Sequence, residues 1–445
     1  MRAEGAAEAT ARLQARCVPQ QPLSAQQVLD GSQLSAAARA EVRTLLSEEA
    51  WLVRQRAASC TPLGRNVYVG LAGMAFALDA ASRTLSDPRL ASAAADLFDL
   101  GAADDHERGM PSLLCGESGA LVVRALLRPI EASSDGGPIE RFVALSALVD
   151  RDKDFDDDVL YGRAGLLIGC LVLQPHAEPG SLAAEQLSWL ASRLAQHLLE
   201  RGRAQASTAL AAGTHPPAAS GHVEPPLLYR WHGAHYLGAA HGLLGVVHAL
   251  VCWLRSARAS PSTATPQLGA LATQVIDATV ETLDWLLTQL DALGNLPARV
   301  DERAARRHEP SELVAWCHGA PGAAIVFAFA ARELGVERFG AAAVRFGELS
   351  FERGVLRKGP GLCHGLGGNG FAMLALLRLT RDPIWLVRAC QFAQAIGSAS
   401  VRAASRTPDH PYSLFEGEAG AIAFLAALGA DDPACARFPF FECDA

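Results

Sequence analysis

The feature that most constrains the fold of this chain is a Gly-x-x-Gly element that recurs seven times, each copy followed by an apolar run. The copies begin at Gly70, Gly116, Gly162, Gly242, Gly319, Gly365 and Gly417. Four of the six intervals between successive copies span 46 to 52 residues, and the other two span 80 and 77. Self-similarity at a fixed period is typical of proteins that repeat one supersecondary unit. The chain is therefore organised as a repeat with two insertions.

Each repeat unit is predicted to be a helical hairpin. The run after a glycine pair, such as Ala323–Leu334, is apolar nearly all round and predicts a buried helix. A second, amphipathic helix follows, as at Leu187–Arg201. The two long intervals contain Arg203–Pro226 and Ala257–Gly269, which are rich in Ala, Ser, Thr and Pro and predict surface loops.

Seven such hairpins predict an all-α fold, an α/α toroid in which an outer ring of helices wraps an inner ring. An open solenoid is the alternative, but it needs polar capping repeats, and the seventh unit, Tyr412–Leu428, is as apolar as the others. The glycines let the chain turn sharply and let backbones approach closely, so all seven turns should lie at one end. We place the barrel at residues 63–430, between an N-terminal helical or irregular segment, 1–62, and a C-terminal tail, 431–445.

Composition and charge exclude several functional classes. A net charge of −8 argues against nucleic acid as a partner, which would need a basic surface. Met1–Leu23 has no apolar run and predicts no signal peptide. The apolar stretch Gly233–Leu254 contains three histidines, which are costly in a bilayer, so a seven-span membrane receptor is disfavoured. Ten scattered cysteines fit a reducing compartment. We expect a cytoplasmic protein, and the sequence leaves peripheral membrane association open.

The residue directly before each glycine pair should face the shared end of the barrel. These residues are Val69, Cys115, Tyr161, His241, His318, His364 and Glu416. Two of the histidines directly follow a cysteine, in Cys317-His318-Gly319 and Cys363-His364-Gly365. Cysteine and histidine at helix N-termini are suitable zinc ligands, because the helix dipole favours the thiolate. Three of these four side chains could bind a tetrahedral ion and leave one position open, as catalytic zinc sites do. For any single buried cysteine, core packing is the alternative.

The segments around these residues resemble those of eukaryotic LanC-like proteins, which are relatives of the bacterial lanthionine cyclases. The resemblance extends from about Tyr68 to Leu428 and rests on Leu160-Tyr-Gly-Arg163, Gly238-Ala-Ala-His-Gly242, Trp316-Cys-His-Gly-Ala-Pro-Gly322, Gly361-Leu-Cys-His-Gly365 and Ser413-Leu-Phe-Glu-Gly417. It implies an α/α toroid with zinc (Zn²⁺) held by Cys317, Cys363 and His364. The implied reaction is addition of a thiol, in the eukaryotic branch glutathione, to dehydroalanine or dehydrobutyrine in a peptide or protein.

Two further residues are expected to take part in this chemistry. His241 matches the family's acid–base histidine, and we expect it to protonate the enolate that forms when a thiolate adds to an α,β-unsaturated amide. Asp158 matches an acidic position of the family and is expected to orient His241 or to assist proton movement. The alternatives are a hydrogen-bonded core histidine at position 241 and a solvated acidic turn at position 158.

Four residues are expected to contact substrates or ligands. Lys358 and Arg163 carry positive charges that suit the two carboxylates of glutathione, and Lys358 matches a family position near the active site. His318 is expected to contact the substrate or the developing enolate. Glu416 is expected to hydrogen-bond a ligand or a backbone turn. For Lys358, simple surface solvation is the alternative.

Two other functions fit part of the pattern. A protein prenyltransferase β-like chain also activates a cysteine thiol with zinc on a similar toroid, but its metal site needs an Asp ligand and a partner subunit. A non-catalytic adaptor that binds glutathione or a protein kinase could retain zinc for stability, because a metal site does not by itself show turnover. The sequence leaves open the identity of the acceptor and whether a kinase or a membrane surface is a partner.

Overall fold

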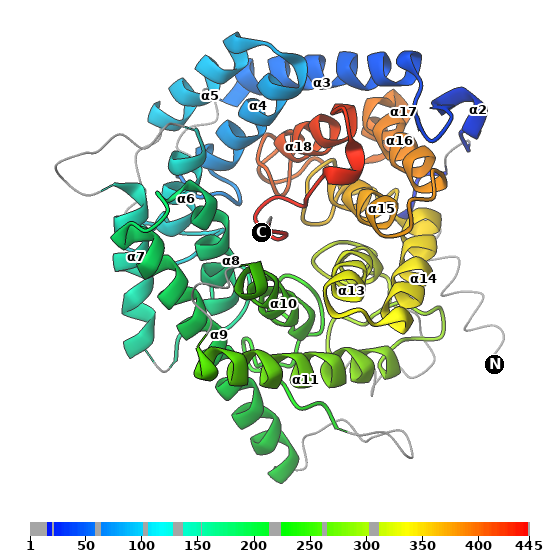
Figure 1. Ribbon diagram of the computed structural model, residues 1–445. Coiled ribbons are helices and arrows are strands. Elements are labelled where there is room, and N and C mark those ends of the chain that lie inside the picture. Colours follow the sequence, from blue (N-terminus) through cyan, green and yellow to red (C-terminus); the bar gives the residue numbers. More distant parts are fainter. Residues whose placement is uncertain are drawn as a thin grey trace.

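The computed structural model describes residues 16–19, 22–57, 64–100, 106–127, 137–152, 154–212, 224–259, 265–301 and 311–443. Within these residues the regular structure is helical, apart from isolated bridges and one antiparallel pair of short strands, β1 (Leu29–Asp30) and β2 (Gln33–Leu34). The helices form two concentric rings (Figure 1). The predicted α/α toroid is confirmed.

The inner ring consists of the helices that follow the glycine pairs. They are α4 (Leu71–Leu85), α6 (Glu117–Leu127), α8 (Arg163–Leu173), α10 (Leu243–Ala259), α13 (Ala320–Leu334), α15 (Leu366–Thr380) and α18 (Glu418–Gly429). Each of these helices packs against the next, and α18 packs against α4, so the ring is closed and the open-solenoid alternative is wrong. No helix among the described residues is both long enough and apolar enough to cross a membrane.

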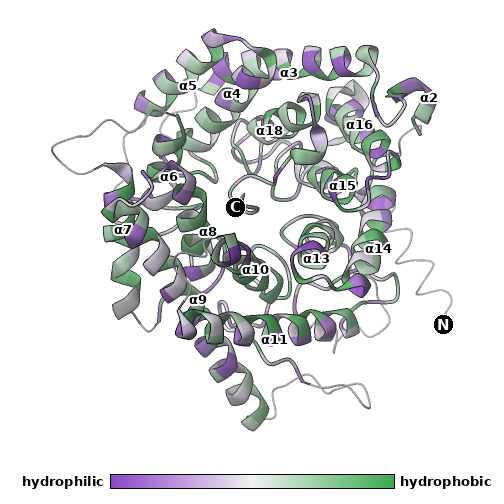
Figure 2. Cartoon of the chain, viewed as in Figure 1, coloured by the Kyte–Doolittle hydropathy of each residue, from purple (hydrophilic) through white to green (hydrophobic). Residues whose placement is uncertain are grey.

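The outer ring covers the inner ring on its outward side. It consists of α5 (Pro88–Leu100), α7 (Pro138–Ala147), α9 (Leu182–Ala211), α11 (Pro266–Thr288), α14 (Glu337–Arg353), α16 (Ile384–Gly397) and α3 (Ala36–Ala57). All except α3 follow an inner helix in sequence, as predicted. Helix α3 comes from the N-terminal segment and packs against α18 and α4, so it supplies the outer helix that the last repeat lacks. Hydrophilic residues recur along α3 and α5 (Figure 2), as expected for helices with one solvated face.

Shorter helical elements lie between or beyond the helices of the two rings. They are α2 (Ala25–Val28), α17 (Ala399–Ala404) and the 3₁₀ turns Leu148–Arg151, Gln174–His176 and Pro433–Cys435. The two predicted insertions are partly helical, which corrects the loop prediction. Helix α9 continues past Arg203 to Ala211 because this stretch is rich in alanine, the strongest helix former. Helix α11 begins at Pro266, with Thr265 as its N-cap. Residues 213–223 and 260–264 of the insertions lie outside the described residues.

The second glycine of each pair lets the inner helix lie against the loop that precedes it. A Cβ on Gly322 would lie 2.2 Å from the carbonyl oxygen of Trp316, and a Cβ on Gly368 would lie 1.9 Å from that of Leu362. The same relation, to the carbonyl six residues earlier, holds at all seven copies. Any side chain would collide with backbone at these distances, so the close approach itself requires glycine.

We expect Gly368→Ala to lower the free energy of unfolding by about 1–3 kcal/mol or more, because the new methyl group forces the backbone apart. Urea titration measures this change. Gly340→Ala on α14 is the matched control, since its Cβ would meet its nearest neighbour at 3.7 Å. In that open helical position alanine should stabilise the protein by up to about 1 kcal/mol. A Gly368→Ala protein as stable as the wild type would contradict this account of the repeat.

Hydrogen bonds join the loops that precede the seven inner helices into a continuous belt, which we call the loop ring. The bonds run from Tyr68 N to Leu114 O (2.8 Å), Ser112 Oγ to Leu160 O (2.6 Å), Val159 N to Ala240 O (3.1 Å), Ala240 N to Cys317 O (3.4 Å), Cys317 N to Cys363 O (3.1 Å), Cys363 N to Phe415 O (2.8 Å) and Phe415 N to Tyr68 O (3.1 Å). The loop ring brings the residues before each glycine pair to one end of the barrel, as predicted.

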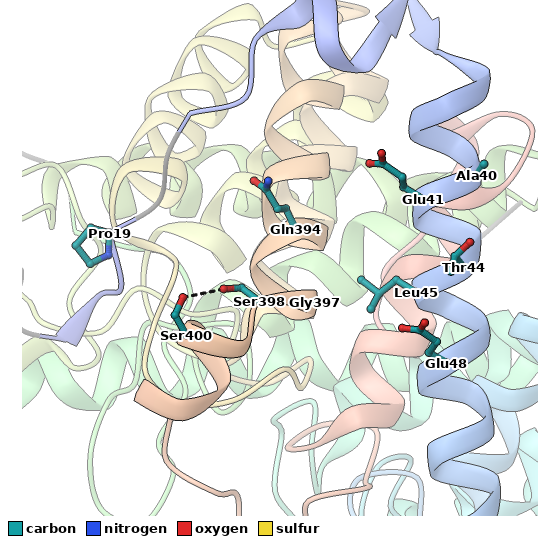
Figure 3. A pocket seen from close by; sticks show the side chains of 10 residues that line it. All are labelled: Pro19, Ala40, Glu41, Thr44, Leu45, Glu48, Gln394, Gly397, Ser398 and Ser400. Atoms are coloured by element: carbon teal, nitrogen blue, oxygen red, sulfur yellow. Dashed lines mark hydrogen bonds between the residues drawn. The ribbon is translucent and has the colours of Figure 1, made fainter.

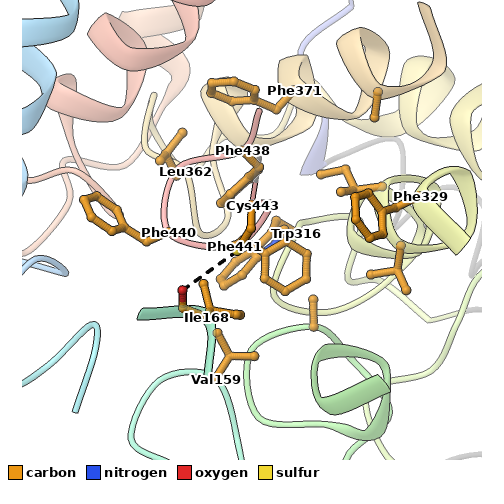
Figure 4. Close-up of a cluster of buried hydrophobic side chains, with 14 of the residues drawn as sticks. Val159, Ile168, Trp316, Phe329, Leu362, Phe371, Phe438, Phe440, Phe441 and Cys443 are labelled. Atoms are coloured by element: carbon orange, nitrogen blue, oxygen red, sulfur yellow. Dashed lines mark hydrogen bonds between the residues drawn. The ribbon is translucent and has the colours of Figure 1, made fainter. Parts of the chain in front are cut away.

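The C-terminal segment fills the centre of the barrel. The C-terminus lies in the middle of the rings in Figure 1, and Phe438, Phe440 and Phe441 are buried there (Figure 4). Trp316 stacks on Phe438 with ring centroids 5.0 Å apart and meets Phe441 edge-on at 5.2 Å. Because Trp316 directly precedes Cys317, this aromatic cluster supports the loop ring beside a predicted zinc ligand.

A buried carboxylate, Glu49, and a half-buried one, Glu418, share one cation where the N-terminal helix closes the ring. Arg402 forms an ion pair with Glu49 of α3 and lies 4.0 Å from Glu418 at the start of α18. Burial, and then the charge of Glu49, raise the pKa of Glu418 to about 8. Glu418 therefore holds a proton at neutral pH, which avoids placing a second negative charge beside a single arginine.

This arrangement predicts a pH dependence of stability. An acid whose pKa is raised by folding contributes most below its unfolded pKa, and the contribution is lost as the pH rises through the folded pKa. For Glu418 this window lies between 4.5 and about 8. We expect the wild type to lose more stability between about pH 6 and pH 8.5 than Glu418→Gln, which cannot ionise. Urea unfolding at both pH values measures this, with the exposed Glu352→Gln on α14 as control. Equal losses in the wild type and Glu418→Gln would exclude the proposed titration.

Candidate metal centre and active site

The structure groups Cys317, Cys363 and His364 at the start of α13 and α15. The sulfur and imidazole nitrogen atoms of these residues all lie within 4.8 Å of one another. Cys363 is buried, with 4% of its surface exposed, while His364 is partly exposed. Two thiols and one imidazole are the donors that zinc prefers, and three protein ligands leave one position for a substrate. The residues present therefore fit the expected metal.

Hydrogen bonds within the cluster favour a thiolate. The Cys363 thiol donates to Cys317, and together with His364 and His318 it lowers the pKa of Cys317 well below its usual range, against the opposing effect of burial. A thiolate is the form that binds metal and attacks carbon. The loop ring thus brings together two sulfurs that share one negative charge, which lies on Cys317, because the hydrogen bond to Cys317 and burial raise the pKa of Cys363.

His318 lies beside the cluster without belonging to it. Its ring is 5.8 Å from that of Tyr236, and its Nδ1 is buried without a hydrogen-bond partner among the described residues. The sequence alone left open which three of the four Cys and His side chains converge, and the geometry selects the set without His318. Its orphaned nitrogen is available to a bound molecule, because a buried polar atom normally has a partner.

Tyr68 is a site residue that sequence reasoning missed. Its hydroxyl hydrogen-bonds the Cys363 thiol, and its ring stacks on Phe415 at 4.8 Å. Burial, and then Cys363, raise the pKa of Tyr68 far above its usual range, so the phenol stays protonated and can donate. Its position next to the first glycine pair could have identified it. The sequence analysis considered only the residue directly before Gly70, which is Val69, and Tyr68 lies one residue earlier.

His241 and Asp158 form a hydrogen-bonded pair on neighbouring loops of the ring. Nδ1 of His241 donates to Oδ2 of Asp158 at 2.5 Å, and the Tyr161 amide donates to the other carboxylate oxygen at 3.0 Å. Asp158 is only 3% exposed, so the alternative of a solvated surface turn is wrong. The side chain of His241 is 15% exposed, and its Nε2 remains available because Asp158 engages Nδ1. The pair has the geometry of an oriented general acid–base.

An aromatic wall surrounds His241. Trp231 stacks on the His241 ring at 3.7 Å, and Tyr161 lies parallel to it at 6.0 Å. Trp231 belongs to a tight turn closed by reciprocal backbone hydrogen bonds with Ala234, and the turn has positive φ at His232 and Gly233. The sequence analysis missed Trp231, because it lies in the long interval between repeats rather than next to a glycine pair.

Arg163 has a structural role in place of the expected contact with glutathione. Its side chain is 3% exposed and pairs with Asp157 at 2.9 Å. Further guanidinium hydrogen bonds reach the carbonyl oxygens of Phe155 and Asp152. A guanidinium so enclosed holds the 152–157 segment against α8 and offers no open face to a carboxylate. This corrects the substrate-binding prediction for Arg163.

Lys358 and Glu416 lie on the loops of the sixth and seventh repeats. Lys358 is exposed, five residues before Cys363. The Glu416 carboxylate accepts from the backbone amide of His410 at 3.3 Å and pairs with its Nδ1 at 3.1 Å. Glu416 thus stabilises the turn before its own glycine pair, which is one of the two roles expected from the sequence. Its charge also acts on the Cys363 thiol.

A separate groove lies on the outer surface between α3 and α16. It has a volume of about 820 Å³ and carries Glu41 and Glu48 on one wall and Ser398 and Ser400 on the other (Figure 3). It contains none of the predicted site residues. This groove is therefore separate from the candidate site on the loop ring.

The sequence model of the lanthionine synthetase C-like protein family matches residues 61–443. The chain belongs to this family. The LanC-like protein is 31% identical to "Glutathione S-transferase LANCL1" from Danio rerio over 382 residues, which cover 84% of each chain. It is 30% identical to "LanC-like protein GCL1" from Arabidopsis thaliana over 290 residues, which cover 64% of this chain and 57% of the relative. The family match argues against the prenyltransferase β-like alternative.

Solved structures support the same fold. Nisin cyclase superimposes on the LanC-like protein with a TM-score of 0.55 over 88% of this chain and 94% of its own, at 15% sequence identity. At this identity the likeness concerns the fold alone. The toroid thus agrees with a known architecture, while function rests on the residues of the site.

Proposed function

We propose that this protein catalyses zinc-dependent addition of the glutathione thiol to dehydroalanine or dehydrobutyrine residues in peptides or proteins. The observation that carries the proposal is the adjacency of the Cys317–Cys363–His364 cluster and the His241–Asp158 pair on one loop ring, where Ala240 donates to the carbonyl of Cys317. The name of the Danio rerio relative, a glutathione S-transferase, supports glutathione as the thiol. We place the reaction in the cytoplasm, where reducing conditions keep thiols free.

Cys317, Cys363 and His364 would hold the zinc ion. A bound zinc ion would lower the pKa of a thiol that occupies its open coordination position, so that the thiol would lose its proton. Tyr68 would stabilise this arrangement by donating a hydrogen bond from its hydroxyl group to the Cys363 sulfur. The cluster lies at the mouth of a largely apolar barrel, so electrostatic contacts there are screened less than in water.

Residues around the cluster would stabilise the enolate and deliver the proton that it takes up at the α-carbon. Addition forms a bond from sulfur to the β-carbon, breaks the carbon–carbon double bond and places a negative charge on the enolate oxygen. His318, with its unpartnered Nδ1, is suited to hydrogen-bond this oxygen. His241 would deliver a proton from Nε2 to the α-carbon while Asp158 holds Nδ1. The thiol loses one proton and the α-carbon gains one, so the addition is balanced.

Lys358 is the residue we assign to a glutathione carboxylate. It is exposed and close in sequence to Cys363, and it retains a mobile ammonium group. Arg163 is excluded from this role by its buried ion pair. We expect removal of the Lys358 charge to raise KM for glutathione with little change in kcat, as for a residue that binds without reacting.

The test is direct. The purified zinc-loaded protein is mixed with glutathione and a dehydroalanine peptide, and mass spectrometry measures the adduct against a protein-free control. Adduct formed well above the control rate supports the proposal. Full zinc occupancy without adduct above the control would favour the non-catalytic adaptor.

A further inference from the structure

A small cavity of about 260 Å³ lies beside the proposed acid–base pair. The segment 154–157 forms one side of it, and the outer helix α9 forms another. Its charged and polar lining consists of Asp154, Asp156, Asp157, Arg201, Gln205 and Arg230. The cavity is separate from the Cys317–Cys363–His364 cluster, and no step of the proposed reaction uses it.

Two of the carboxylates in the cavity, those of Asp157 and Asp156, differ in their hydrogen bonding. Asp157 is fully engaged, because it accepts hydrogen bonds from Arg163 at 2.9 Å, from Arg201 at 2.8 Å and from Gln205 at 3.2 Å. The carboxylate of Asp156 is half-buried and has no hydrogen-bond or ion-pair partner among the described residues, although His232 and His241 act on it electrostatically. Burial, and then Asp158, raise the pKa of Asp156. A cation bound next to Asp156 would offset both the burial of its negative charge and the repulsion from Asp158.

The cavity adjoins the place where the acceptor must react. Asp156 is two residues before Asp158, and its carboxyl interacts electrostatically with His241. Arg230, on the cavity wall, directly precedes Trp231, which stacks on His241 at 3.7 Å. If His241 protonates the α-carbon of the dehydroamino acid, the neighbouring residues of the acceptor pass beside this cavity. Lys358 and the thiol-binding cluster lie on other loops of the ring, which separates the region for glutathione from that for the acceptor.

We propose that this cavity binds a basic side chain, lysine or arginine, that lies close to the dehydroamino acid in the acceptor. The inference rests on the proposed function and specifies its acceptor. The unpartnered carboxylate of Asp156 is the group that recognises the cation, with Asp154 at the exposed edge adding negative charge. Arg230 forms no ion pair with Asp156 within the described part of the chain, and its Nε donates to the Gly233 carbonyl at 3.0 Å.

The test compares peptides that differ in one side chain. Each has an acetylated N-terminus, an amidated C-terminus and a central dehydroalanine, with lysine, norleucine or glutamate next to it on either side. We expect kcat/KM for the lysine peptide to exceed that for norleucine by about fivefold to tenfold, as for one partly exposed charge-assisted contact. The glutamate peptide should be the poorest. A peptide with a free N-terminal amine and norleucine tests whether an ammonium group from the chain end serves equally well.

Amino-acid substitutions in the protein test whether the preference for the lysine peptide depends on Asp156. Asp156→Asn should bring the lysine-to-norleucine ratio close to one, and the exposed Asp96→Asn on α5 should keep the wild-type ratio. Equal rates for lysine and norleucine, or a ratio unchanged in Asp156→Asn, would overturn the inference and leave the proposed function intact. If no peptide reacts, the proposed function fails. Fluorescence anisotropy with unreactive alanine peptides then decides separately, and equal binding of lysine and norleucine would reject the cavity as a cation site.

Discussion

Replacement of Cys363 by alanine is expected to remove zinc from the protein and abolish glutathione addition. Cys363 contributes one of the two sulfurs within 4.8 Å of the His364 ring nitrogen. If a complete structural site is worth roughly 10–16 kcal/mol, one ligand is worth a few, which corresponds to at least about a hundredfold in affinity. Elemental analysis of the purified variant should find less than a tenth of the zinc in the wild type. The barrel should remain folded by circular dichroism, because the Cys363 backbone bonds in the loop ring are unchanged.

Cys115→Ala is the matched control for this prediction. Cys115 directly precedes a repeat glycine, one position nearer than Cys363 does, and like Cys363 it hydrogen-bonds a tyrosine, Tyr161. It lies outside the metal cluster of the described residues. Its removal should leave the zinc content unchanged. Full zinc occupancy in Cys363→Ala, or equal loss of zinc in both variants, would show that the ion is held elsewhere.

The repeat architecture could be predicted because its physical cause is local. Each second glycine lies against a carbonyl six residues earlier, so the requirement for glycine is visible within a short window of sequence. The role of α3 could not be predicted in this way. It carries no glycine pair, and its contacts with α18 join residues from the two ends of the chain. The C-terminal phenylalanines were likewise assigned to a tail, because only the closed ring shows that they fill its centre.

The site was partly predictable for a related reason. The zinc ligands and His241 lie next to repeat glycines, where the loop ring must bring side chains together. Tyr68 lies two residues before a repeat glycine, as Cys317 and Cys363 do, but it was missed because a phenol is not a typical zinc ligand, and Trp231 was missed because it lies in a turn between repeats. Arg163 was misassigned because a sequence shows a charge but not its partner. The guanidinium of Arg163 pairs with the buried carboxylate of Asp157, six residues earlier, and is therefore not available to a substrate carboxylate.

Replacement of His241 by alanine is expected to lower kcat by about a hundredfold to ten-thousandfold while zinc stays bound, since general acid–base groups contribute on this scale. His241 is not among the clustered metal donors, so its loss should not disturb the ion. The reaction in D₂O gives a sharper measurement. The wild type should place one deuterium on the α-carbon with a single configuration. The residual product of His241→Ala should be a mixture of both configurations, because water reaches either face of the enolate. A single configuration in that variant would identify another residue as the proton donor.

Asp158→Asn tests whether the carboxylate acts through His241. Asparagine can still accept the Tyr161 amide hydrogen bond, but it cannot hold Nδ1 of His241 as a charged acceptor. We expect a loss of about tenfold to a hundredfold in kcat with unchanged zinc content and little change in KM for glutathione. Residues that act as a unit are not additive, so the double variant with His241→Ala should be no slower than His241→Ala alone. If the two losses multiplied, Asp158 would have to contribute to the reaction independently of His241, for example by shaping the cavity beside it.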